Sequence, residues 1–243
     1  FQAKPAELIV IPRSYAPNIC RIIHNKLDHP VPSQMKKLFS KSYFTLDSDT
    51  VLKEVYDTCE VPCQASRILP KETMEYKTET KPPTAGSFLN ADVMEEACQK
   101  VLVLRDNLTS YTSTAFIKDQ TKNTLRDSLL ILASRTRLNR SPVQCRVDAH
   151  SSFKGLAKDG SLEKMGLLLE IGHPKNPNHN SVAETAIKEL RQELVKLSPH
   201  GGRVSEKTLA LATENLNSRI RHVGRSAKEL WTSRDQVSGA NLT

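Results

Sequence analysis

The chain has 243 residues, of which 38% are apolar and 26% charged. It contains no apolar run of the roughly eighteen residues that a membrane helix needs, and no secretory signal at its start. We therefore expect a soluble protein, long enough for more than one domain. The net charge of +8 and the pI of 9.3 favour a polyanionic partner. A generically basic soluble protein would have the same excess of positive charge.

Residues 1–66 form the first predicted domain and contain paired histidines and cysteines. Four residues separate His24 from His29, and three separate Cys59 from Cys63. Two imidazoles and two thiolates suit a closed tetrahedral Zn²⁺ site, and a bound ion would stabilise a domain with so small a core. The same residues also fit two surface histidines and two buried thiols.

Residues 67–86 are predicted to be a linker, because they are polar, interrupted by prolines and without helical periodicity. Residues 87–243 form the second predicted domain, which mixes strands and helices. Its predicted strands are Phe88–Met94, Lys100–Leu104, Ser110–Ile117, Val143–Asp148 and Met165–Ile171. Its predicted helices are Thr121–Arg135, Ser152–Lys158, Ser181–Leu197, Ser205–His222 and Ser226–Thr232. This order of elements indicates an α/β fold.

Three carboxylates of the second domain are candidate metal ligands. Fifty-five residues separate Asp92 from Asp148, and thirty-five separate Asp148 from Glu184. Asp148 ends a predicted strand and Glu184 begins a predicted helix, so the three acids can meet at one edge of a sheet. Mg²⁺ prefers oxygen ligands, and a pair of such ions can clamp the attacking and leaving oxygens of a phosphoryl transfer. Asp106 competes with Asp92, but we expect it to serve in a turn, because it ends the next strand.

The sequence around these acids resembles a known family. The segment Pro174–Glu184 reads PKNPNHNSVAE, and Ser226–Asp235 reads SAKELWTSRD. Both are similar to stretches in the catalytic core of retroviral and LTR-retrotransposon integrases, including the gypsy-like and BEL/Pao-like groups. The resemblance covers residues 86–242 and implies a ribonuclease H-like core, in which a five-stranded mixed sheet is flanked by helices. It also extends to the His-His-Cys-Cys pattern, although the family usually has two residues between the cysteines, where this chain has Glu60, Val61 and Pro62.

The resemblance implies a polynucleotidyl transferase that processes the 3′ ends of linear element cDNA and joins them to target DNA. Asp92, Asp148 and Glu184 would hold two Mg²⁺ or Mn²⁺ ions, and the helical domain would hold one structural Zn²⁺. The partners implied are double-stranded DNA and further copies of the chain, as a dimer or tetramer. The implied location is the nucleus or a virus-like particle.

Five residues in the asparagine-rich segment Pro174–Glu184 and the predicted helix after it are candidate DNA contacts: Lys175, Asn176, Asn180, Lys188 and Arg191. Lys188 and Arg191 follow Glu184 by four and seven residues, so the three share one helix face. The two cations could instead pair with acids of the same helix, which contributes only tenths of a kcal/mol.

Two other functions remain open from the sequence. One is a nuclease or transposase with the same fold, against which the His-His-Cys-Cys pattern and the thirty-five-residue spacing argue. The other is a non-catalytic DNA- or chromatin-binding protein derived from an integrase. All three acids are present, so nothing in the sequence requires this alternative.

Overall fold

The computed structural model describes residues 8–27, 29–59, 63, 84–136, 142–158, 160–172, 180–221 and 224–242. The chain forms two compact units, and each is described by itself. One unit combines Phe1–Leu69 with Ser218–Thr243, and the other is Pro70–Asn217. Within the described ranges, no helix has both the length and the apolar character needed to cross a bilayer.

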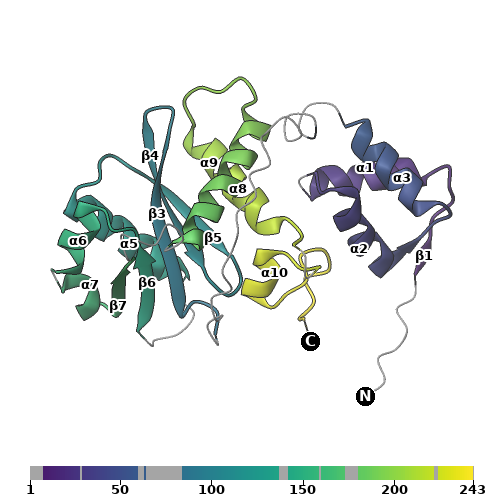
Figure 1. The fold of residues 1–243 in the computed structure, drawn as a ribbon. Helices are drawn as coiled ribbons and strands as arrows, with labels where there is room; N and C mark the ends of the chain where they lie inside the picture. The colour runs from purple at the N-terminus through teal and green to yellow at the C-terminus, as the bar shows by residue number, and fades with distance from the viewer. Residues whose placement is uncertain are drawn as a thin grey trace, which may run out of the picture. The chain divides into compact units, whose positions relative to one another are not determined.

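The larger unit is built on a five-stranded mixed sheet (Figure 1). Its strands are β3 (Phe88–Glu96), β4 (Gln99–Asp106), β5 (Thr112–Ile117), β6 (Val143–Val147) and β7 (Leu167–Ile171), in the order β5-β4-β3-β6-β7. The first three strands run antiparallel to one another, whereas β6 and β7 run parallel to β3. The central strand β3 therefore has an antiparallel partner on one side and a parallel partner on the other.

Alternation along the strands divides the sheet into two faces. Leu89 and Ala91 of β3 face α5 (Lys122–Thr136) and α6 (Ser151–Ala157), where they join the larger apolar core. Met94 of β3 joins a second core with α8 (Ser181–Leu197) and α9 (Glu206–Ser218) on the opposite face. Because successive side chains of a strand point to opposite faces, Asp92 lies on the α8 face with Met94.

Helix α8 covers its face of the sheet through an apolar stripe. Ala186, Ile187 and Leu190 are buried against residues of β3 and β4 such as Met94 and Val103. Full burial of an aliphatic side chain contributes about 1.5–3 kcal/mol, so this stripe fixes α8 firmly on the sheet.

The fold class predicted from the sequence is confirmed: a mixed five-stranded sheet with helices, of the ribonuclease H-like type, together with a small helical unit. In the sheet unit and the segment after it, two elements differ from the prediction by more than two residues. The short helix α7 (Ser161–Lys164) was not predicted, and α9 ends at Ser218 rather than at residue 222. Ile220 is buried as the predicted stripe required, but it forms a β-bridge with Ser226 beyond the helix end.

The described N-terminal part of the smaller unit contains the helices α1 (Ala16–Lys26), α2 (Pro32–Ser42) and α3 (Ser48–Asp57), and the two-residue strands β1 (Ile9–Val10) and β2 (Tyr43–Phe44). Its core is small and includes Cys20, Met35, Phe39 and Leu52. A core of this size gives marginal stability, so further stabilisation is needed.

The segment after Ser218 belongs to the same compact unit as the three N-terminal helices. The Gln34 side chain of α2 donates a hydrogen bond to the Ile220 carbonyl oxygen at 2.6 Å. Helix α10 (Ala227–Thr232) starts with a capping box, in which Ser226 and Glu229 each bond to the other's backbone N–H. The buried Glu229 carboxylate also accepts the N–H of Gln236 at 3.3 Å, so it ties down the residues that follow α10.

Candidate metal sites in the two units

His24, His29, Cys59 and Cys63 come together in the smaller unit, and their ligand atoms all lie within 4.8 Å of one another. The Cys59 Sγ atom is 3.2 Å from His29 Nδ1, and Cys63 Sγ is 3.3 Å from His24 Nε2. A tetrahedral zinc ion with bonds of about 2.0–2.3 Å separates its ligand atoms by roughly 3.3–3.8 Å. The four residues therefore have the chemistry and close to the spacing of a structural zinc site.

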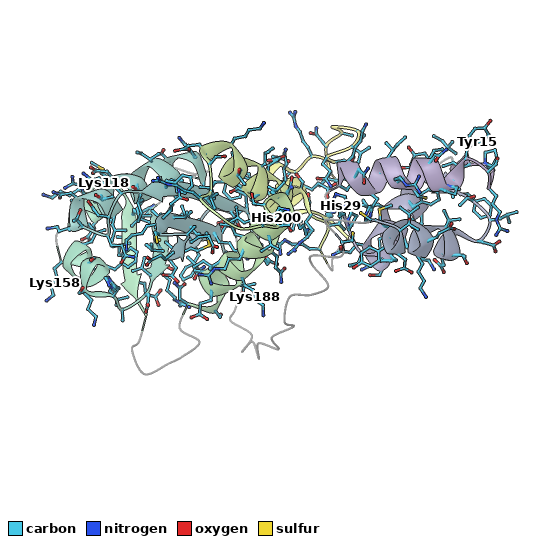
Figure 2. The ribbon with its side chains drawn as sticks, turned by 90° about the horizontal axis from the view of Figure 1, so that it is seen from above. Tyr15, His29, Lys118, Lys158, Lys188 and His200 are labelled. Atoms are coloured by element: carbon cyan, nitrogen blue, oxygen red, sulfur yellow. The ribbon has the colours of Figure 1, made fainter. Side chains whose placement is uncertain are left out.

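The end of α1 produces the spacing of the two histidines. The N–H of His29 donates to the His24 carbonyl oxygen at 2.8 Å, which is the six-residue bond of a Schellman motif. His29 (labelled in Figure 2) has a φ of 55°, in the left-handed region that non-glycine residues enter only at a cost of about 1–2 kcal/mol. A strained backbone of this kind is found mainly where it serves a site, and here it brings the His29 side chain into the cluster.

The cluster has a buried half and a partly exposed half. His24 and Cys63 are each 1% exposed, whereas His29 and Cys59 are half-buried. The three residues between the cysteines lie outside the described residues, but Cys59 and Cys63 both reach the cluster. The additional residue relative to the usual family spacing therefore does not separate the two thiols.

In the larger unit, Asp92 lies in β3 and Asp148 directly follows the neighbouring strand β6. Ala91 of β3 pairs with Val147 of β6 in parallel register. Asp92 and Asp148 are the next residues along these two strands, and both are half-buried. Each carboxylate accepts the N–H of the residue that follows it, Val93 or Ala149. Two carboxylates at adjacent strand positions can share a divalent cation.

Helix α8 brings Glu184 toward the same strands. The residue before the helix, Asn180, donates from Nδ2 to the Ala91 carbonyl oxygen at 3.0 Å, and Ala91 directly precedes Asp92. Glu184 lies one turn later, and its N–H donates to the Asn180 carbonyl oxygen at 3.1 Å. Glu184 is half-buried and oriented by a helix that packs on β3 and β4.

Asp92, Asp148 and Glu184 do not form a converged group of the kind that the histidines and cysteines form. Among the described residues, only the His-His-Cys-Cys set brings three or more potential ligand atoms so close. Like charges repel at short range, so three carboxylates are expected to converge fully only around cations. Their oxygen-only donor set, partly open to solvent, suits Mg²⁺ or Mn²⁺.

Asp106, the competing carboxylate, has a structural role. It is fully buried at the end of β4, where Oδ1 accepts the N–H of Gly86 at 2.8 Å. Its Oδ2 accepts both the N–H and the hydroxyl of Thr109, each at 2.7 Å. Three donors thus bind its two oxygens, as expected for a residue that holds a turn.

The candidate DNA contacts have different surroundings. Lys175 and Asn176 lie outside the described residues. Asn180 is 2% exposed, so its side chain is directed into the protein. The exposed Arg191 pairs with Glu96 at 3.4 Å and donates to the Glu95 carbonyl oxygen at 3.2 Å, which are partners on β3 rather than on its own helix. Lys188, labelled in Figure 2, lies half-buried on α8 one turn after Glu184.

A buried ion pair on the α8 face was not predicted. Arg105 of β4, whose side chain is 2% exposed, pairs with Glu189 of α8 at 2.5 Å. Arg105 stands opposite Asn90 on β3, two residues before Asp92 on the same face. Its position directly after the apolar run Val101–Leu104 was the available signal, because a buried charge requires a partner.

The other cysteines, Cys20, Cys98 and Cys145, belong to no cluster of potential metal ligands among the described residues. Burial raises the pKa of Cys20 to about 11 and that of Cys145 to about 12, so both thiols stay protonated at neutral pH. Cys98, by contrast, is exposed. It lies in the two-residue turn between β3 and β4, where Ala97 and Cys98 both have positive φ.

Comparison with known proteins agrees with the class of fold seen here. No model of a known protein family matches the chain, and no curated protein matches it. Among solved structures, it is similar to a crystal structure of the catalytic core domain of BIV integrase, with a TM-score of 0.50 and 19% sequence identity. The match covers 61% of this chain and 95% of that one. At this identity the similarity establishes the fold, so any statement on chemistry depends on the residues of the site.

Proposed function

We propose that this chain is an integrase-type polynucleotidyl transferase of an LTR retrotransposon or retrovirus-like element. The observation that carries the proposal is the pairing of Ala91 with Val147, which directly precede Asp92 and Asp148, together with the hydrogen bond from Asn180, four residues before Glu184, to the Ala91 carbonyl oxygen. The similarity of the fold to an integrase core supports it.

In this proposal Asp92, Asp148 and Glu184 would hold two Mg²⁺ or Mn²⁺ ions, which would supply Lewis-acid activation of the attacking oxygen and stabilisation of the leaving one. Strand β3 carries Asp92, Asp148 directly follows β6, and α8 carries Glu184. No covalent intermediate on the protein is needed. Water is the nucleophile when a 3′ end is processed, and the new 3′ hydroxyl is the nucleophile when it is joined to target DNA.

The proposal extends to the smaller unit and to the partners. His24, His29, Cys59 and Cys63 hold one structural Zn²⁺, because their donor set and spacing fit a tetrahedral site. The net charge of +8 suits double-stranded DNA, and phosphate contacts make such binding salt-dependent. Self-association, a nuclear site of action and assembly in a virus-like particle follow from the same proposal.

A strand-transfer assay tests the function directly. Purified chain is incubated with Mg²⁺ or Mn²⁺, a short duplex ending in CA and supercoiled plasmid, beside an Asp148→Asn variant. Joined product that disappears in the variant supports the proposal. DNA binding by the wild-type chain without any joined product, over a series of end sequences, would instead favour a non-catalytic DNA-binding protein.

A further inference from the structure

Helix α8 begins at a buried asparagine whose side chain is bonded to a strand. Asn180 precedes α8, is 2% exposed, and donates from Nδ2 to the Ala91 carbonyl oxygen. Asparagine is common before a helix because its side chain usually caps the first turn. The Asn180 side chain makes no such cap. It therefore connects two elements and does not stabilise the helix start in the usual way.

Both ends of this connection adjoin a predicted metal ligand. Ala91 is the residue before Asp92, and the Asn180 carbonyl oxygen accepts the N–H of Glu184. Two hydrogen bonds thus link the backbone beside Asp92 to the backbone of Glu184. Loss of the first bond would free the beginning of α8 while the apolar stripe further along held the rest of the helix in place.

A second buried asparagine, Asn217, shows what a purely structural anchor looks like in the same unit. It is also 2% exposed, and it joins α9 to β5 through two bonds to Thr112. Its Nδ2 donates to the Thr112 carbonyl oxygen and its Oδ1 accepts the Thr112 N–H, each at 2.8 Å.

Asn180 uses only the donor half of its amide. Its buried Oδ1 has no hydrogen-bond partner among the residues that the structure describes, and a buried unsatisfied acceptor costs about 1–3 kcal/mol. Such a group in a native structure calls for an explanation. The explanation is that Asn180 connects the backbone beside two predicted metal ligands. The arrangement of that backbone is set by function as well as by stability.

We infer that Asn180 is a positioning residue, which sets the distance of Glu184 from Asp92 and thereby the affinity of the carboxylates for divalent cations. This inference rests on the proposed function for the identity of the metal site. It gives Asn180 a role inside the protein instead of the DNA contact expected from the sequence.

The test measures Mn²⁺ binding to the full chain by electron paramagnetic resonance, without DNA and with zinc supplied beforehand. Asn180→Ser keeps a residue that caps helices well but is too short to reach Ala91 as asparagine does. We expect its melting temperature to stay near that of the wild type while Mn²⁺ binds about tenfold more weakly, the usual scale for a residue that orients a metal ligand. Asn180→Ala should show the same weaker binding.

Asn217→Ala is the matched control, because it removes an equally buried helix-to-strand anchor away from the carboxylates. It should lower the melting temperature and leave Mn²⁺ affinity unchanged. Wild-type affinity in Asn180→Ser, or an equal loss in Asn217→Ala, overturns the positioning role while the metal site stands. Mn²⁺ binding that is insensitive to Glu184→Gln and Asp148→Asn overturns the metal site, and the positioning role with it.

Discussion

The two candidate metal sites of this chain are built in opposite ways. In the smaller unit, four ligands converge within 4.8 Å in a unit with a small apolar core. In the larger unit, a well-packed sheet and helix carry the three predicted carboxylate ligands, which do not form a converged cluster among the described residues. The histidine and cysteine cluster suits an ion that stabilises the fold. The three carboxylates suit ions that also bind a substrate.

Removal of zinc is expected to have the largest effect and to separate the two units. Structural zinc contributes about 10–16 kcal/mol in small zinc-binding domains. Cys63→Ser, or a strong chelator, should therefore abolish amide protection in α1 and α3 and leave β3 and β4 protected. Hydrogen exchange read by mass spectrometry measures both units in one sample. Equal protection of α1 with and without zinc would remove the stabilising role of the ion.

Breaking the buried ion pair of the sheet unit comes next. Arg105→Met leaves Glu189, 16% exposed, without its close cation, and such a change costs about 3–5 kcal/mol. Urea unfolding of the sheet unit gives the value. The double variant with Glu189→Leu should recover most of the loss, because an apolar pair of similar size replaces the charges. If the double variant is as unstable as the single one, the charge of Glu189 is not the cause.

A change at a carboxylate should affect activity and not stability. Glu184→Gln removes a predicted metal ligand of similar shape, so strand transfer should fall by at least about 100-fold, or about 2.7 kcal/mol. The melting temperature should change little, in contrast to the zinc ligands. Retained activity would exclude Glu184 from the site.

The smallest expected effect is on DNA affinity. Lys188→Glu should weaken binding of all DNA sequences alike and reduce the slope of log K against log salt by about one, as expected for a lost phosphate contact. Binding titrations at several salt concentrations give this slope. Arg191→Ala is a useful comparison, because Arg191 already pairs with Glu96 and should change the slope less. An unchanged slope in Lys188→Glu would place that lysine away from phosphate.

The sequence predicted most of what depends on local pattern. Helix α8 has the bounds expected from its apolar periodicity, and the spacing of the histidines and cysteines pointed to a cluster that the structure contains. The pairing of Arg105 with Glu189 joins residues 84 positions apart, and no local pattern reports such a contact. Likewise, the burial of Asn180 depends on how α8 meets β3, so sequence alone suggested an exposed loop residue. The exposure of Cys98 follows from a tight turn at Ala97 and Cys98, which lacks the glycine or asparagine usual at such positive φ values.

The joining of the segment after Ser218 to the N-terminal helices has a consequence for how the chain folds during synthesis. The bond from Gln34 to the Ile220 carbonyl oxygen spans 186 positions, and the whole sheet unit is made between these two residues. Contacts of such long range form slowly, and domains generally fold in the order in which they leave the ribosome. The smaller unit begins first and is completed last, after the sheet unit has emerged.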